Sequence, residues 1–449
     1  MTRALQKKLN DSPVARWSIL IVVAFTMFCG YFITDVMAPL MDLLKDEFSW
    51  SPTEYGIFNM AYGWLNVFLF MLIFSGMILD KLGARLTGVA ACALMIAGCG
   101  LKYYAVSQPF EGEIFGLRTQ VFIASIGFAV FALGIESAGI TVTKVIVRWF
   151  KGYEVALAMG IQVAVARLGT ALAMSTTIPL AKYFGSLSAP ILSGLGALCI
   201  GMIAYLVFCV MDRKLDKSLA GTDEGKEEPF RLKDIGFIIG NKGFWLIAML
   251  CVLFYSAVFP FLKYATSLMI NKYHVASELA GNIPAILPFG TILLTPLFGG
   301  IYDKRGKGAT IMIIGSAMLI VVHALFSLPA LNVWWFASFL MIILGIAFSL
   351  VPSAMWPSVP KIIPENKLGT AYALIFWVQN IGLSLVPLLI GWILDKYCTV
   401  TEGAITRFDY TLPMIIFTGF GILALCTALL LKREDRLKGY GLEKPNMKR

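Results

Sequence analysis

The chain has 449 residues, of which 58% are hydrophobic and only 14% are charged. An average soluble domain carries about 25% charged residues, so this composition excludes an ordinary water-soluble protein. A net charge of +10 can indicate a nucleic-acid-binding protein. Here, however, the basic residues lie between apolar stretches, where they indicate membrane topology instead.

Apolar stretches that are free of charge recur along the whole chain. Residues 18–34, 279–302 and 410–431 contain no Asp, Glu, Lys or Arg, and residues 308–360 contain none over a length that fits two helices. A bilayer crossing needs about 20 apolar residues, and its backbone groups must be satisfied within the segment, so we expect helices. We predict twelve of them, at residues 17–44, 54–79, 84–107, 118–147, 153–182, 188–211, 243–271, 277–302, 308–328, 332–360, 366–395 and 410–431.

The longest polar connection falls between the sixth and seventh predicted helices. We therefore divide the chain into an N-terminal six-helix bundle (1–211), a cytoplasmic linker (212–242) and a C-terminal six-helix bundle (243–449). Most of the 37 Lys and Arg residues fall on the side of the termini and the linker, which predicts that both termini are cytoplasmic.

Cysteine and histidine usage offers no sign of catalysis or metal binding. Seven of the eight cysteines fall inside predicted helices, Cys398 is expected in an outer loop without a partner, and there is no CxxC pair. The two histidines, His274 and His323, form no cluster, and no HExxH or Walker loop exists. We expect no cofactor, no metal and no enzymatic activity.

A repeated motif follows the second and the eighth predicted helices, 223 residues apart. Both copies contain Gly, three residues, Asp-Lys, one residue and Gly, followed by basic residues. The first copy consists of Gly76, Asp80, Lys81, Gly83 and Arg85, and the second of Gly299, Asp303, Lys304, Gly306 and Lys307. Internal repeats of this kind are typical of secondary transporters.

With these two loops the sequence resembles the major facilitator superfamily. The resemblance implies an all-α membrane protein with twelve transmembrane helices in two pseudo-symmetric six-helix bundles. A narrower resemblance, to the lysosomal dipeptide carriers of the superfamily and their prokaryotic relatives, covers about residues 120–175 and 350–392. Its segments are Arg148–Glu154, Ala166–Gly169, Met355–Pro360 and Pro364–Tyr372.

The narrower resemblance implies a substrate site. A Glu on helix 4 is expected to bind the peptide ammonium group and an Arg on helix 5 the carboxylate, and these positions are Glu136 and Arg167 here. Trp356 is expected to line the same site. The resemblance also implies a small-molecule substrate, in particular a dipeptide.

The depth of the charges supports that site independently. A charged residue at the centre of a membrane helix costs about 2.5–3.5 kcal/mol, so it indicates function by default. Glu136 and Arg167 both lie about 18–20 Å from the cytoplasmic ends of neighbouring helices, at 1.5 Å per residue. Either they contact a two-ended substrate, or they neutralise each other as a structural salt bridge.

Two sets of residues are expected to act as gates. Asp35 and Lys263 lie 228 residues apart, at nearly symmetric positions near the outer ends of helices 1 and 7, and we predict a salt bridge between the halves that closes the outer side. Substrate or proton contact is the alternative for this pair. At the cytoplasmic side we predict an inner gate made of Asp80, Arg85, Asp303 and Lys304.

Polar and aromatic residues on helices 2 and 11 complete the expected site. Tyr62, Gln379 and Asn380 are predicted to line it. The resulting hypothesis is a transporter of a small zwitterionic solute, most simply a dipeptide, by alternating access. An organic-anion or phosphate-ester transporter is the alternative, since Arg167 together with Lys263 would suit an anion. A protein of a different class, a membrane-embedded enzyme or a transporter-like scaffold, is the remaining possibility.

The cellular location follows from the loops and the tail. No acidic dileucine signal or outward-facing glycosylation sequon is present, which favours a bacterial inner membrane. We expect a monomer whose basic C-terminal tail contacts lipid headgroups, with no nucleic-acid partner.

Overall fold

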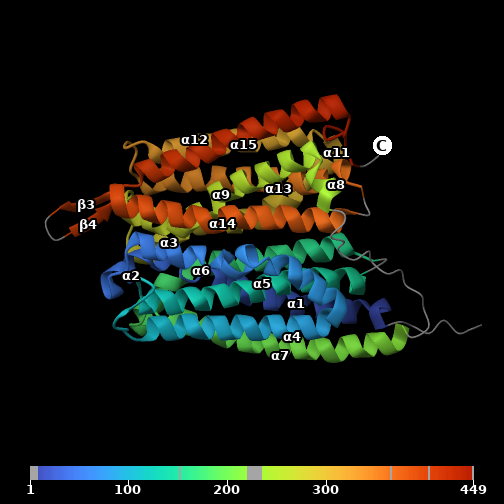
Figure 1. Ribbon diagram of the computed structural model, residues 1–449, viewed down its shortest axis with the longest axis horizontal. Helices are drawn as coiled ribbons and strands as arrows, with labels where there is room; N and C mark the ends of the chain where they lie inside the picture. Colours follow the sequence, from blue (N-terminus) through green and yellow to red (C-terminus); the bar gives the residue numbers. More distant parts are fainter. Residues whose placement is uncertain (1–8, 151–152, 220–234, 365–366, 403–404, 447–449) are drawn as a thin grey trace, which may run out of the picture.

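A computed structural model of the chain describes residues 9–150, 153–219, 235–364, 367–402 and 405–446. The described chain is almost entirely helical, and Figure 1 shows its long helices running side by side in two groups. Helices α1 to α7 form one group, the N half, and helices α8 to α15 form the other, the C half. This arrangement confirms the predicted fold class.

The N half contains seven α-helices, a π-helical segment and one hairpin. They are α1 (Pro13–Asp35), α2 (Met41–Phe48), α3 (Pro52–Met60), the π-helical η3 (Trp64–Phe68), α4 (Met71–Ser107), β1 (Glu113–Ile114), β2 (Leu117–Arg118), α5 (Thr119–Phe150), α6 (Val155–Phe184) and α7 (Ala189–Leu219). Two short 3₁₀ helices, η1 (Leu9–Asp11) and η2 (Ala38–Leu40), flank α1.

The C half has the same general plan and ends in a second hairpin before its last helix. Its elements are α8 (Ile235–Ile239), α9 (Lys242–Asn271), α10 (Ser277–Ala280), α11 (Asn282–Arg305), α12 (Gly308–Ser327), α13 (Trp334–Ile362), α14 (Leu368–Tyr397), β3 (Thr399–Glu402), β4 (Ile405–Phe408) and α15 (Thr411–Lys438). The β3–β4 hairpin lies at one end of the molecule, which we call the hairpin end, and the start of α1 and the end of α15 lie at the other, the termini end (Figure 1).

Local capping explains several of the boundaries. Ser12 caps α1 by accepting a hydrogen bond from the Ala15 amide, and Asn241 caps α9 in the same way through the Phe244 amide. Ser51 and Glu54 form a reciprocal capping box at the start of α3. These caps satisfy amide groups that have no partner within the helix.

The second predicted helix, residues 54–79, is not continuous. Eleven helical segments among the described residues are long and apolar enough to cross a membrane, and this stretch is not among them. It consists of α3, the π-helical segment η3 and the first turns of α4, and Phe70 between them has a left-handed φ of 55°. The Val67 carbonyl of the π-helical segment accepts a 3.1 Å hydrogen bond from Trp377 Nε1 of the C half, besides a 3.3 Å bond from the Phe70 amide.

Two other boundaries also differ from prediction. The predicted first helix, 17–44, is interrupted between α1 and α2 by the 3₁₀ helix η2. The predicted sixth helix ends at residue 211, whereas α7 continues to Leu219 and so runs into the segment predicted as a linker. Residues 220–234 of that linker lie outside the described part of the chain.

Close packing joins the two halves at the hairpin end. A Cβ on Gly391 of α14 would lie 2.3 Å from the Pro52 carbonyl oxygen at the start of α3, and a Cβ on Gly281 would lie 2.0 Å from the Met174 carbonyl oxygen of α6. Only glycine permits such approaches. Toward the termini end, a Cβ on Gly76 or Gly299 would meet nothing within 4 Å. The helices are therefore tightly closed at the hairpin end and have free space beside the glycines of the repeated motif.

Candidate functional site

Glu136 is the carboxylate of the predicted site, and it is held by one hydrogen bond. Its Oε1 accepts a 2.6 Å bond from the Tyr62 hydroxyl, which lies just before the π-helical segment of the N half. Both side chains are partly buried. Since an ionised carboxylate has about four acceptor positions, most of the acceptor capacity of Glu136 stays free for another donor.

Arg167 lies on α6 and contacts aromatic faces from both halves. Its guanidinium carbon is 5.8 Å from the ring centre of Tyr31 in the N half, 5.1 Å from Phe259 and 5.5 Å from Phe348 in the C half. Within the described part of the chain, no hydrogen bond or ion pair engages this guanidinium. Cation–π contacts hold a charge in place without using its N–H donors.

The two charges lie at the same depth but are not paired with each other. Glu136 is 14 residues before the end of α5, and Arg167 is 12 residues after the start of α6, which is about 20 Å from the termini end in each case. No ion pair joins them among the described residues, so a mutual structural salt bridge is absent there.

Trp356 belongs to an aromatic cluster in the C half, together with Tyr255 and Phe376. Its indole Nε1 donates a 3.0 Å hydrogen bond to the Tyr255 hydroxyl, and its ring stacks on Phe376 at 4.8 Å between centres. Tyr255 also packs edge-on against Phe348 and in a tilted arrangement against Phe259. These two rings continue the cluster to Arg167. The predicted Trp356 and Arg167 thus border one continuous aromatic surface.

Gln379 and Asn380 differ from the expectation that they line a site. Gln379 is 8% exposed, and its Oε1 accepts a hydrogen bond from the Cys251 thiol of α9 within the C half. Asn380 is 2% exposed, and its amide group donates to the Phe376 carbonyl of its own helix. Both side chains therefore make their hydrogen bonds within the C half, and among the described residues Asn380 Oδ1 has no partner.

Asp35 and Lys263 form an ion pair between the halves. Lys263 Nζ donates to Asp35 Oδ1 at 2.6 Å and to the Thr34 carbonyl at 3.0 Å. Thr170 of α6 donates to Asp35 Oδ2 at 2.8 Å, and the Tyr55 hydroxyl donates to the Lys263 carbonyl at 2.9 Å. The pair is 13–14% exposed, so it lies in the protein interior near the hairpin end.

Further polar contacts between the halves lie at the same end. The Thr53 hydroxyl donates to Asp395 at 2.6 Å, and Asn271 donates to Asp42 at 3.0 Å. Lys182 at the end of α6 donates to Ser277 and forms an ion pair with Glu278. Together with the glycine contacts, these bonds hold the hairpin end closed.

Lys102 is a buried charge that the sequence interpretation missed. It lies on α4 with no solvent exposure, and its Nζ donates a 2.8 Å hydrogen bond to the Ile33 carbonyl. The sequence signal was present, since Lys102 lies within the predicted helix 84–107, but it is five residues from the end and so was counted with the outer membrane edge.

The predicted inner gate is organised differently from the expectation. Arg85 does not reach the other half, because it forms ion pairs with Asp212 at 3.7 Å and Asp216 at 2.7 Å on α7 of its own half. Arg148 of α5 binds the same two carboxylates. The side chain of Asp80 lies outside the described part of the structure.

The second copy of the motif contacts the C-terminal tail. Asp303 Oδ1 accepts a 2.7 Å hydrogen bond from the Asn446 side chain, and the Asp303 carbonyl accepts from the Asn446 amide at 3.1 Å. Lys304 is exposed. The C-terminal tail therefore occupies the Asp303 carboxylate, which we expected to belong to the inner gate.

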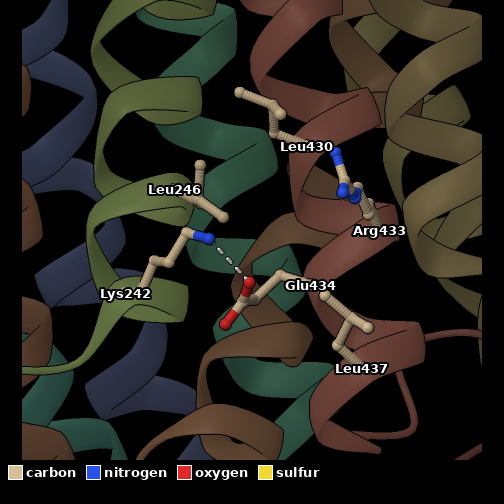
Figure 2. A pocket seen from close by; sticks show the side chains of 6 residues that line it. All are labelled: Lys242, Leu246, Leu430, Arg433, Glu434 and Leu437. Carbon is tan, nitrogen blue, oxygen red and sulfur yellow. Dashed lines mark ion pairs between the residues drawn. The ribbon is translucent and has the colours of Figure 1, made fainter.

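A surface pocket lies elsewhere, at the termini end of the C half. Figure 2 shows it between α9 and α15, with Lys242 paired to Glu434 at 3.0 Å. Its lining consists of Lys242, Leu246, Leu430, Arg433, Glu434 and Leu437. Since all six residues belong to the C half, this pocket is not between the halves, where a transported substrate must pass.

Among the described residues, the side chains that commonly bind metal ions do not cluster. No group of three or more His, Cys, Asp or Glu residues is placed there to hold a metal ion. All eight cysteines are free. Cys398 was expected in an outer loop but is only 4% exposed, and burial raises the pKa of its thiol to about 11.

Comparison with known proteins places this geometry in a family. A family model described as the Major Facilitator Superfamily matches residues 21–387. The lysosomal dipeptide transporter MFSD1 of Mus musculus is 29% identical over 456 residues, covering 98% of this chain and 91% of the relative. The protein of the same name from Homo sapiens is 27% identical over 452 residues, covering 98% and 90%.

Solved structures share the fold at low identity. A bacterial homolog of the human lysosomal transporter Spinster, in an inward-facing and unoccupied conformation, has a TM-score of 0.73 and 13% identity, covering 94% of this chain and 98% of that one. The nucleoside transporter NupG has a TM-score of 0.70 and 15% identity, covering 93% and 99%. Because the family model matches most of its length, the chain belongs to the major facilitator superfamily.

Proposed function

We propose that this transporter moves a small zwitterionic solute, in particular a dipeptide, across the membrane by alternating access. The observation that carries the proposal is the state of its two mid-membrane charges. Arg167 has no polar partner among the described residues, and Glu136 has only the Tyr62 hydroxyl. An ionised group without a partner is expensive inside a membrane protein, so each charge is best explained by a substrate that binds it.

A dipeptide matches both groups at once. Its carboxylate suits the planar guanidinium of Arg167, which can donate two parallel hydrogen bonds. Its ammonium group suits the free oxygen positions of Glu136. The aromatic surface that includes Trp356 and Phe259 would then contact the side chains or the peptide plane. We retain Glu136, Arg167, Tyr62 and Trp356 as substrate contacts, and leave out Gln379 and Asn380.

The relatives support the same class of substrate. The two MFSD1 proteins are named lysosomal dipeptide transporters, and the similarity spans 98% of this chain in each case. At 27–29% identity the name alone does not decide the substrate, so the proposal depends on the charges described above.

We further propose that the hairpin end faces the outside and that the state described is inward-facing. The Asp35–Lys263 pair then acts as the outer gate, and both termini lie in the cytoplasm of a bacterial inner membrane. The two halves are divided as expected from the sequence, except that α7 extends to Leu219 within the expected linker. Opening of the hairpin end would break this pair and separate the glycine contacts. Asp80, Arg85, Asp303 and Lys304 remain candidates for the inner gate in the opposite state.

A thermal-shift screen of the purified protein with dipeptides, amino acids and organic anions tests the substrate class. Dipeptides are expected to raise the melting temperature of the wild type, and this shift should disappear in both Glu136→Gln and Arg167→Ala. Stabilisation by an organic anion that is lost only in Arg167→Ala would favour the anion-transporter alternative. A dipeptide shift that survives both substitutions would contradict the proposed site.

A further inference from the structure

A second lysine lies beside the Asp35–Lys263 pair and is not explained by transport of a solute. Lys102 Nζ donates to the Ile33 carbonyl, and Lys263 Nζ donates to the next carbonyl of the same helix, that of Thr34. Two ammonium groups therefore reach the same turn of α1, and one carboxylate, Asp35, lies there. Because the two carbonyls belong to adjacent residues, Lys102 lies close to both Asp35 and Lys263.

The aromatic environment of Lys102 fits a charged ammonium group. Its Nζ is 4.6 Å from the ring centre of Phe128, 5.2 Å from that of Phe131 and 5.8 Å from that of Phe58. Lys263 Nζ is 5.9 Å from the same Phe128 ring. The Phe128 ring is thus shared by the two cations, which repel each other unless a carboxylate compensates both.

The two lysines belong to different halves, and this difference matters during transport. Lys102, Asp35 and Thr170 are all in the N half, whereas Lys263 is in the C half. When the hairpin end opens, Lys263 must leave with the C half. Asp35 and Lys102 then remain together in a site where a lone carboxylate would carry a large desolvation cost.

We propose that Lys102 is a positioning residue of the outer gate, which takes over Asp35 as its partner when Lys263 withdraws and so stabilises the outward-open state. With the hairpin end closed, one carboxylate serves two lysines, and the repulsion between the lysines opposes closure. With the hairpin end open, Asp35 and Lys102 form a neutral pair. The inference rests on the proposed closure at the hairpin end, but not on the identity of the substrate.

Lys263 and Lys102 are therefore expected to have opposite effects on the equilibrium between the closed and the open hairpin end. Removing the charge of Lys263 removes a bond between the halves and should favour the open state. Removing the charge of Lys102 removes repulsion in the closed state and the partner of Asp35 in the open state, so it should favour the closed state. A lysine with a merely structural role would not produce this reversal of sign.

Distances between spin labels at Tyr183 and Tyr397 measure the closure directly. These residues lie at the hairpin ends of α6 and α14 and are 84% and 61% exposed. The exposed Cys199 and Cys426 would be replaced by alanine, and the full-length protein would be reconstituted in nanodiscs. Lys102→Gln is the informative change, because glutamine keeps a donor for the Ile33 carbonyl while it removes the charge.

Lys102→Gln is expected to raise the ratio of short to long distances by about fivefold or more, the usual range of coupling between sites. Lys263→Gln and the matched control Lys182→Gln, which loses another bond between the halves, should lower that ratio. Lys102→Arg should resemble the wild type. A Lys102→Gln distribution that is unchanged, or shifted towards the long distance, would overturn the inference.

A second variant keeps the test open if Lys102→Gln does not fold. The double variant Asp35→Asn/Lys102→Gln removes one charge of each sign, so the summed charge of Asp35, Lys102 and Lys263 stays as in the wild type. Compared with Asp35→Asn alone, it should shift towards the short distance, because the two lysines no longer repel each other. An identical distribution for these two proteins would contradict the proposed role. The absence of dipeptide binding would affect neither result.

Discussion

Replacing Gly391 by alanine should open the hairpin end, because the added methyl group has no room there. An ideal Cβ at this position lies 2.3 Å from the Pro52 carbonyl oxygen and 3.1 Å from Gly56 Cα. Both atoms belong to the backbone of α3, so the neighbour cannot rotate away. The two helices must separate by about 1 Å to reach an ordinary van der Waals contact.

The size of the effect follows from the cost of overpacking. Extra methyl groups in a well-packed interior cost about 1–3 kcal/mol, and each 1.4 kcal/mol changes an equilibrium about tenfold. The closed state should therefore lose a factor of about 5–150 relative to the open state. The gain in helix propensity from Gly to Ala, about 1 kcal/mol, acts in both states and cancels.

The spin-label distance between Tyr183 and Tyr397 would report this shift as a larger population of the long distance. Gly419→Ala on α15 is the matched control, since its Cβ would meet nothing within 4 Å. It should leave the distribution unchanged. A Gly391→Ala protein with the wild-type distribution would refute the argument that backbone contact at this glycine closes the hairpin end.

Three further predictions concern packing and charge away from the substrate. Trp377→Phe keeps an aromatic ring but removes the indole donor, so the Val67 carbonyl retains only its bond from the Phe70 amide; a chemical denaturation curve should show a loss of about 1 kcal/mol, and no loss would contradict a stabilising role of the Trp377 bond. Asp212→Asn leaves Arg148 and Arg85 with one carboxylate fewer. It should destabilise the protein by about 1–3 kcal/mol, whereas an unchanged melting temperature would show that solvent screening makes these ion pairs unimportant for stability. Cys398 should resist maleimide at pH 7.5 in the intact membrane protein, because its thiol is buried and has a raised pKa, while rapid labelling would show an accessible loop.

The features that the sequence predicted well depend on the cost of charge in a membrane. Charges inside long apolar stretches are conspicuous, so the sequence alone predicts that Asp35 and Lys263 are partners. Their spacing nearly equals that of the repeated motif, so their symmetric positions followed from the sequence alone. The fold class followed from the same contrast between apolar helices and polar loops.

The features that were missed depend on contacts between segments that are distant in sequence. The break in the second predicted helix occurs at Phe70, where no proline or glycine indicates the end of a helix. It is stabilised by Trp377, which lies more than 300 residues later in the sequence. Asp303 binds Asn446 of the tail, and no local pattern connects the two. The contacts of Gln379 with Cys251 and of Asn380 with its own helix could not be predicted, because the rotation of α14 is set by its neighbours.

Lys102 represents a different kind of omission. The residue is charged and lies in an apolar stretch, so the rule that identified Asp35 applied to it as well. It was overlooked because a lysine near a helix end can extend to the membrane surface. In the structure its side chain instead turns inward to the Ile33 carbonyl, a direction that depends on three phenylalanines from two other helices.

Calorimetric titration with a matched set of ligands tests the central claim most directly. The set contains a dipeptide, its N-acetyl derivative and its C-terminal amide, each titrated into the wild type, Glu136→Gln and Arg167→Ala. N-acetylation should weaken binding to the wild type but make little difference to binding by Glu136→Gln. C-terminal amidation should weaken binding to the wild type but make little difference to binding by Arg167→Ala. Equal losses in all three proteins would show that Glu136 and Arg167 do not bind the two ends of the substrate.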